Sequence, residues 1–100
     1  MLVVAPRGEI DLATVDLVLD AIEREHLPGE PLAIDLRDVG FMDTSGLRLV
    51  IGLNQRAADE NFELRVVRGP APVQRVFEVA GLVPRLPFVD DPMQRPDPVD

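Results

Sequence analysis

Three consecutive polar residues, Asp43, Thr44 and Ser45, lie between apolar residues where an extended segment is expected to give way to a helix. Ser45 is the only serine in the 100-residue sequence. A hydroxyl at the start of a helix can cap the helix, and it can also carry a phosphate beside the free backbone N–H groups of the first turn. The first role is structural and the second is a switch. Residue type and position alone favour the cap.

The rest of the sequence offers few residues for catalysis. All ten basic residues are arginine, there is a single histidine, His26, and there is no lysine, cysteine, tyrosine or tryptophan. The sequence also lacks a glycine-rich phosphate loop and a cluster of metal-ligating residues, so a small nucleotide-hydrolysing enzyme is disfavoured. We therefore expect a binding protein with no catalytic residues, no cofactor and no metal.

Charge and hydropathy limit the partners of the chain. Eighteen acidic residues against ten basic ones give a net charge of −8, and no basic cluster offsets it, so direct binding to nucleic acid or to an anionic membrane surface is not expected. No apolar run approaches the roughly 20 residues of a membrane span. The absence of cysteine fits a reducing environment, and we expect a cytoplasmic protein.

Strand-like and helix-like segments alternate along the chain. Short apolar runs predict strands at residues 2–5 (with a possible continuation toward residue 10), 32–36, 64–67 and 86–89. Apolar residues three and four apart predict helices from residue 14, capped by Thr14, to about 25, from about 45 to 59, and from 70 to about 80. This alternation predicts an α/β fold of about four strands in a mostly parallel or mixed sheet. Residues 1–90 are expected to form one domain, and the proline-rich residues 91–100 a disordered tail.

The order of these elements predicts where a site would lie. In parallel sheets, sites form at the carboxyl ends of the strands. Asp35 ends one strand, where it is expected to bind loop N–H groups, and the turn containing Asp43 follows it. The segment at residues 8–11 follows the first strand. We therefore expect residues 8–11 and 43–46 to adjoin at one edge of the sheet.

Three segments of this sequence resemble the STAS family, the bacterial anti-sigma factor antagonists. They read Gly-Glu-Ile-Asp-Leu-Ala-Thr at residues 8–14, Ile-Asp-Leu with Phe-Met-Asp-Thr-Ser-Gly-Leu at residues 34–36 and 41–47, and Val-Phe-Glu-Val-Ala-Gly-Leu at residues 76–82. Each motif is weak alone, but three in register make a strong match that covers residues 2 to 90. The resemblance implies a compact sheet with helices packed on one side. The family usually has one more strand before the one that begins here at residue 2, and a further helix where this chain has residues 91–96, so we expect both elements to be missing from this chain.

The resemblance further implies a partner-switching function. The unmodified antagonist would bind an anti-sigma factor that is also a serine kinase, which releases the sigma factor. The kinase would then phosphorylate the antagonist and abolish binding, and a separate phosphatase would remove the phosphate. Carried over to this sequence, the acceptor is Ser45, with Thr44 as the alternative. The partner-binding residues implied by the resemblance are Asp11, Met42, Asp43, Thr44, Gly46 and Leu47.

A second interpretation uses the same fold without phosphorylation. In this case the chain is a fixed STAS adaptor subunit of a transporter or a sensory complex, and Ser45 only caps its helix. Whether the gene lies beside that of an anti-sigma kinase or that of a transporter permease would distinguish the two interpretations.

Overall fold

The fold is an α/β arrangement built on a parallel four-stranded sheet, as the sequence predicts. The computed structural model describes residues 1–97. The main sheet has the strand order β1-β3-β5-β6, with all pairs parallel. These strands are β1 (Leu2–Val4), β3 (Leu32–Asp35), β5 (Leu64–Val67) and β6 (Phe88–Val89). The helices of the described residues are α1 (Val15–Glu25), α2 (Thr44–Glu60), α3 (Ala71–Val79) and a 3₁₀ turn, η1 (Val83–Arg85).

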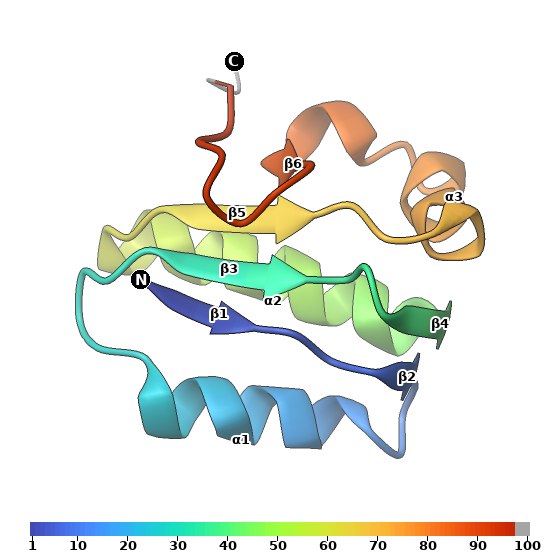
Figure 1. The fold of residues 1–100 in the computed structure, drawn as a ribbon, viewed down its shortest axis with the longest axis horizontal. Helices are drawn as coiled ribbons and strands as arrows, with labels where there is room; N and C mark the ends of the chain where they lie inside the picture. Colours follow the sequence, from blue (N-terminus) through green and yellow to red (C-terminus); the bar gives the residue numbers. More distant parts are fainter. Residues whose placement is uncertain (98–100) are drawn as a thin grey trace.

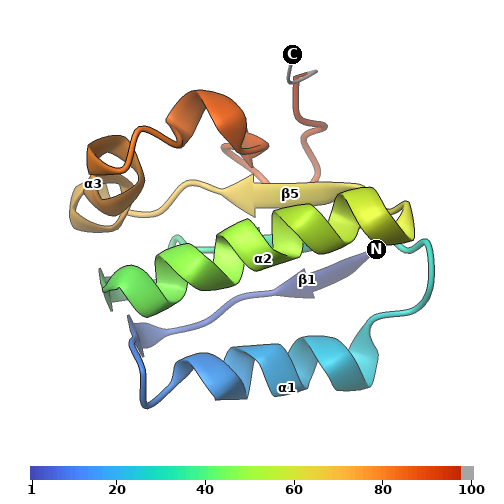
Figure 2. The ribbon, with the colours of Figure 1, turned by 180° about the vertical axis from the view of Figure 1, so that it is seen from behind.

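Two helices cover one face of the sheet. Seen from behind, α2 lies in front of the strands, α1 runs along the β1 edge of the sheet, and α3 packs beyond the carboxyl ends (Figure 2). Ile34 and Val66 of the central strands face the core formed with these helices, and all residues of β3 and β5 are buried. Continuous apolar runs are typical of such covered parallel strands. The prediction that the helices pack on one side of the sheet is confirmed.

A second, two-stranded ladder extends the main sheet at its carboxyl edge. β2 (Gly8–Ile10) follows β1, and β4 (Val39–Met42) follows β3, and the two pair in parallel (Figure 1). Residues 39–42 form β4, although the sequence analysis predicted no strand there. Gly40 suggested a turn, but the strand buries Val39 and Met42 and exposes the two residues between them. Pro6 lies in the break between β1 and β2, where its missing N–H cannot join a ladder.

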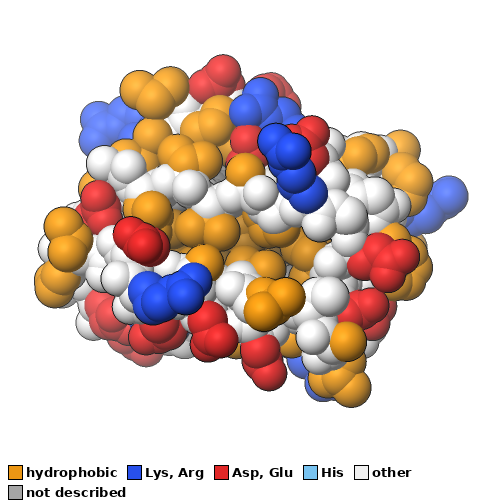
Figure 3. Space-filling view, turned by 60° about the horizontal axis from the view of Figure 1, so that its bottom comes forward, with side chains coloured by type: hydrophobic (Ala, Val, Ile, Leu, Met, Phe, Trp, Pro, Cys, Tyr) orange, Lys and Arg blue, Asp and Glu red, His pale blue; other side chains and the backbone are white. Residues whose placement is uncertain are grey.

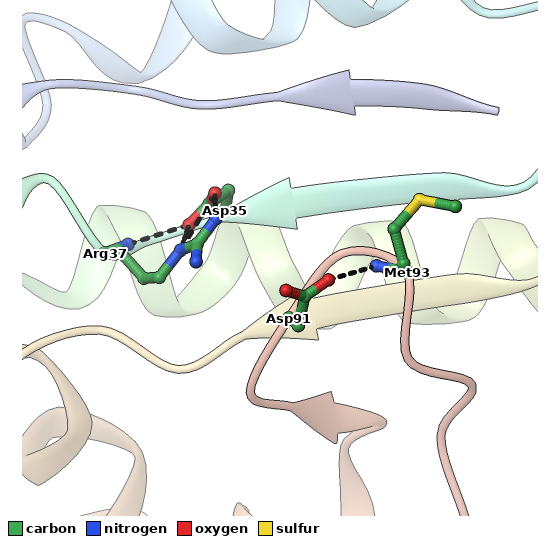
Figure 4. Close-up of polar contacts among 4 residues, drawn as sticks. All are labelled: Asp35, Arg37, Asp91 and Met93. Atoms are coloured by element: carbon green, nitrogen blue, oxygen red, sulfur yellow. Dashed lines mark hydrogen bonds and ion pairs between the residues drawn. The ribbon is translucent and has the colours of Figure 1, made fainter.

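The C-terminal segment crosses the other face of the sheet, in front of β5 (Figure 1). Arg65 of β5 is 8% exposed and donates a hydrogen bond of 2.7 Å to the carbonyl of Pro92. Arg95 lies 3.7 Å from Glu63, and the N–H of Met93 donates to the carboxylate of Asp91 at 2.7 Å (Figure 4). These contacts place Pro92 and Arg95 beside β5. A disordered tail at residues 91–100 stays a prediction, and residues 98–100 lie outside the described residues.

The helices are short relative to a bilayer. Within residues 1–97, no helix combines the length and the apolar composition that crossing a membrane requires.

Candidate functional site

The two segments expected to adjoin do meet at the carboxyl edge of the sheet. β2 ends at Ile10 and β4 ends at Met42, and these two residues are partners in the parallel ladder. The N–H of Asp43 donates a hydrogen bond of 3.2 Å to the carbonyl of Ile10, which joins the two segments directly beyond the ladder. The prediction that residues 8–11 and 43–46 lie side by side is confirmed.

Asp43, and not Ser45, caps the second helix. Its carboxylate accepts a hydrogen bond of 2.7 Å from the N–H of Ser45, and its carbonyl accepts from the N–H groups of Gly46 at 3.1 Å and Leu47 at 3.4 Å. The helix begins at Thr44, so Ser45 lies inside the first turn, and the prediction that it caps the helix was wrong. The extended backbone of Asp43 aims its short carboxylate at the N–H two residues on, as in other capped helices. The hydroxyl of Ser45 is therefore not required to cap the helix.

Asp11 organises the start of the first helix in the same way. Its carboxylate accepts hydrogen bonds from the N–H groups of Ala13 at 3.0 Å and Thr14 at 3.1 Å. Thr14, which the sequence suggested as a cap, makes no side-chain cap hydrogen bond, so that expectation was wrong. Its hydroxyl instead donates to the carbonyl of Glu9 at 2.9 Å and accepts from the N–H of Asp11 at 2.9 Å. This arrangement holds β2 to the start of α1.

Two apolar grooves, each of about 500 Å³, flank the first turn of the second helix. The apolar lining of the α1–α2 groove comes from Leu12, Val15, Leu19, Leu49 and Leu53, and Ser45 lines it as well. The α2–α3 groove lies between β4, the start of α2 and the face of α3 that carries Val76 and Val79, and Thr44 lies on its wall. Because neighbouring residues of a helix are about 100° apart around its axis, the two adjacent hydroxyls open into different grooves.

Three of the six predicted partner-binding residues line the α2–α3 groove, and none of the six lines the α1–α2 groove. Met42 and Leu47 line the α2–α3 groove together with Thr44, away from the hydroxyl of Ser45. Phe41 is 52% exposed and lines the same groove. Phe41 is next to the buried Met42 in β4, and neighbouring residues of a strand face opposite sides, so the exposure of Phe41 follows from its position. The α2–α3 groove thus presents more apolar surface than the sequence indicated.

Gly46 and Met42 contribute to the site from beneath the surface. Met42 is 4% exposed, and Gly46 is buried on the face of α2 that rests on it. A Cβ atom at Gly46 would collide with Cγ of Met42 and would lie 3.2 Å from Cγ2 of Ile10. The glycine lets the helix start lie directly on the ends of β2 and β4, so these residues position the first turn.

The α1–α2 groove carries basic residues in acidic surroundings. The outer face of α1 includes Asp16, Asp20 and Glu23, and the molecular face in Figure 3 shows hydrophobic side chains near its centre with acidic and some basic side chains around them. Arg56 lines the groove but is held by Glu60 at 3.1 Å and by Glu23 at 2.7 Å, and these carboxylates raise its pKa.

Arg48 is the residue that sequence reasoning missed. It is exposed, lines the α1–α2 groove with Ser45, and forms no ion pair within residues 1–97. The signal that would have found it is its spacing, three residues after Ser45 on the same helix. The sequence analysis named no basic residue beside the serine.

Asp35, at the end of β3, forms an ion pair with Arg37 that stabilises the loop after the strand. Its carboxylate, 10% exposed, accepts hydrogen bonds from the guanidinium of Arg37 at 2.7 Å and 3.0 Å and from the Arg37 N–H at 3.1 Å (Figure 4). The hydrogen bonds from Arg37 lower the pKa of Asp35 below its ordinary value of 3.8. Asp35 thus binds a loop N–H group, as expected. In the part of the chain that the structure describes, no three His, Cys, Asp or Glu side chains are placed to hold a metal ion.

The fold and this site define a STAS domain. The STAS domain family matches residues 1–92, and the chain belongs to that family, which confirms the resemblance. It is 30% identical over 95 residues to the anti-sigma F factor antagonist of Paenibacillus polymyxa, which covers 91% of this chain and 80% of that protein. It is 34% identical over 76 residues to the anti-sigma-B factor antagonist of Listeria monocytogenes, covering 75% and 67%. Osmosensory protein A of Mycobacterium tuberculosis is 28% identical over 74 residues, covering 74% of this chain and 47% of that protein.

Proposed function

We propose that this protein is an anti-sigma factor antagonist controlled by phosphorylation of Ser45. Its unphosphorylated form binds an anti-sigma factor that is also a serine kinase, and this binding releases the sigma factor. Transfer of a phosphate to Ser45 ends the binding, and a phosphatase that acts on phospho-Ser45 restores it. The chain itself supplies the binding surface and the acceptor hydroxyl, and it performs no catalysis.

The observation that carries this proposal is the position of the Ser45 hydroxyl. It lies in the first turn of α2, on the wall of the α1–α2 groove, while Asp43 makes the capping hydrogen bond. The hydroxyl is therefore not committed to holding the helix together. Two relatives named as anti-sigma factor antagonists, at 30% and 34% identity, support the same function.

A phosphate at this position would change the binding surface more than the fold. It adds about −1.5 to −2 charges at pH 7, in a chain whose net charge is already −8. The floor of the groove beside it is apolar. A partner that buries this groove would have to desolvate the phosphate, and burying an ion that lacks a counter-charge from the partner is strongly unfavourable. Partner release follows from this cost.

The acceptor can be tested because the chain has only three aliphatic hydroxyls, those of Thr14, Thr44 and Ser45. The protein is mixed with candidate anti-sigma kinases and ATP, and intact mass and complex formation are measured. We expect one added phosphate and loss of the complex. Ser45→Ala should remain unmodified and bound, while the matched variant Thr44→Val should be modified like the wild type. Phosphorylation of Ser45→Ala at the wild-type rate would refute the assignment and point to Thr44.

The second candidate is a fixed STAS adaptor of a transporter or sensory complex. Similarity to Osmosensory protein A of M. tuberculosis, whose name refers to sensing, favours keeping this candidate. An adaptor would bind its partner equally well as wild type and as Ser45→Glu. A switch would bind much more weakly as Ser45→Glu, so a binding titration of the two proteins separates the candidates.

A further inference from the structure

We propose that Arg48 pairs with the phosphate on Ser45, so that the α1–α2 groove contains its own phosphate-binding cation. This inference rests on the proposed phosphorylation of Ser45. It specifies where the phosphate lies and which side chain balances its charge.

The backbone of the first turn has few donors left for a phosphate. The N–H of Ser45 donates to the Asp43 carboxylate, and the N–H groups of Gly46 and Leu47 donate to the Asp43 carbonyl. Asp43 also places a negative charge beside the acceptor hydroxyl. These three N–H groups are therefore not free to bind a phosphate, although the sequence analysis expected free N–H groups in the first turn. A phosphate on Ser45 needs a side-chain cation instead.

Arg48 is placed to be that cation. Residues three apart on a helix have Cβ atoms about 5–6 Å apart, so the long arginine side chain reaches a phosphate built on Ser45. Both residues line the α1–α2 groove, and Arg48 forms no ion pair within the described chain. The planar guanidinium offers paired N–H donors that match two phosphate oxygens.

The other charged groups near the groove are already occupied or lie elsewhere. Arg56 lies two turns farther along α2 and is held by Glu23 and Glu60. Arg75 lines the α2–α3 groove on the other side of the helix. The carboxylate of Asp11, in the turn before α1, accepts hydrogen bonds from the N–H groups that follow it. Among the described residues, Arg48 is the unpaired cation in the groove that Ser45 lines.

The pair would give the modified protein a defined surface. With the phosphate bound to Arg48, the anion lies over the end of the apolar groove instead of extending into solvent. The exposed cation at the end of this groove is then replaced by a group with net negative charge. A partner that docks with an acidic side chain against Arg48 would lose this contact when Ser45 is modified.

The test uses full-length protein with phosphoserine installed genetically at position 45, followed by a ³¹P NMR titration. A free phosphoserine loses its second proton near pH 6, and a paired cation lowers that pKa. We expect the phosphate pKa to rise by about half a unit in Arg48→Ala, a size consistent with an exposed pair. Arg48→Lys should retain part of the effect. Arg75→Ala, an arginine of the other groove, is the matched control and should leave the pKa unchanged.

Equal phosphate pKa values in the wild type and Arg48→Ala would overturn the inference, as would an equal shift in Arg75→Ala. The phosphate is installed without a kinase and no partner is present. If no anti-sigma kinase modifies the protein, the proposed function fails. The titration can still show whether Arg48 pairs with the phosphate, so the two failures can be told apart. Circular dichroism of each variant confirms that the fold is intact before titration.

Discussion

The carboxylate of Asp43 accepts a 2.7 Å hydrogen bond from the backbone N–H of Ser45. The acidic residue before the helix thus stabilises its first turn, and the serine two residues later keeps its hydroxyl available at the wall of a groove. The division of roles between the two residues allows the modification to change the surface while the helix stays capped.

This division predicts different stabilities for two alanine variants. Asp43→Ala should lower the free energy of unfolding by about 1 kcal/mol, the usual cost of losing a helix cap. Ser45→Ala should change it by no more than about 0.5 kcal/mol, because the serine side chain makes no capping contact. Urea denaturation of the two variants at neutral pH measures both values. A loss in Ser45→Ala equal to that in Asp43→Ala would mean that the serine caps the helix after all.

Two glycines of the second helix should respond oppositely to alanine. Gly46→Ala places a Cβ against the buried side chain of Met42 and should destabilise the fold by about 1–3 kcal/mol. Gly52→Ala has no heavy atom within 4 Å of its new Cβ and should stabilise the helix by up to about 1 kcal/mol. Thermal melting of both variants tests the contrast. Met42→Ala should cost less stability in the Gly46→Ala background than in the wild type, because the new Cβ occupies space that the methionine side chain vacates. Similar melting temperatures for Gly46→Ala and Gly52→Ala would contradict this packing.

The sequence predicted the main elements because their hydrophobic periods are clear. The apolar run at residues 32–36 and the i, i+3, i+4 pattern after Thr14 correspond to β3 and α1. The ladder of β2 and β4 was missed because these strands are short, and Gly8 and Gly40 resemble turn residues. In the fold, pairing to a neighbouring strand and burial of Ile10 and Met42 outweigh this local preference.

The site was predictable only to the level of neighbouring segments. The rule for carboxyl ends of parallel strands places Asp11 and Asp43 at one edge without any coordinates. The groove into which Thr44 or Ser45 opens depends on the rotation of α2 about its axis, which packing against α1 and α3 decides. For the same reason Arg48 was not recognised as a neighbour of Ser45.

Acid should weaken the fold through the ion pair at the end of β3. Arg37 lowers the pKa of Asp35 in the folded protein, so the ionised carboxylate favours folding. This contribution is fully present above the unfolded pKa, near 3.8, and is lost as the pH falls through the lower folded value. Free energies of unfolding measured by urea denaturation between pH 7 and pH 2 should fall less steeply on the acid side for Asp35→Asn. Identical acid slopes for Asp35→Asn and the wild type would contradict the assignment.

Truncation should show where the C-terminal segment begins to support the sheet. A chain that ends at Met93 keeps the Pro92 carbonyl that accepts from Arg65, whereas a chain that ends at Asp90 loses it. Because the Arg65 side chain is largely buried, losing this acceptor should cost about 1–3 kcal/mol. Arg95→Ala is the control: its side chain is 82% exposed and 3.7 Å from Glu63, so its removal should cost at most about 1 kcal/mol. Thermal melting of the three proteins decides the point. If the chains ending at residues 90 and 93 melt at the same temperature, the segment does not contribute to the stability of the domain.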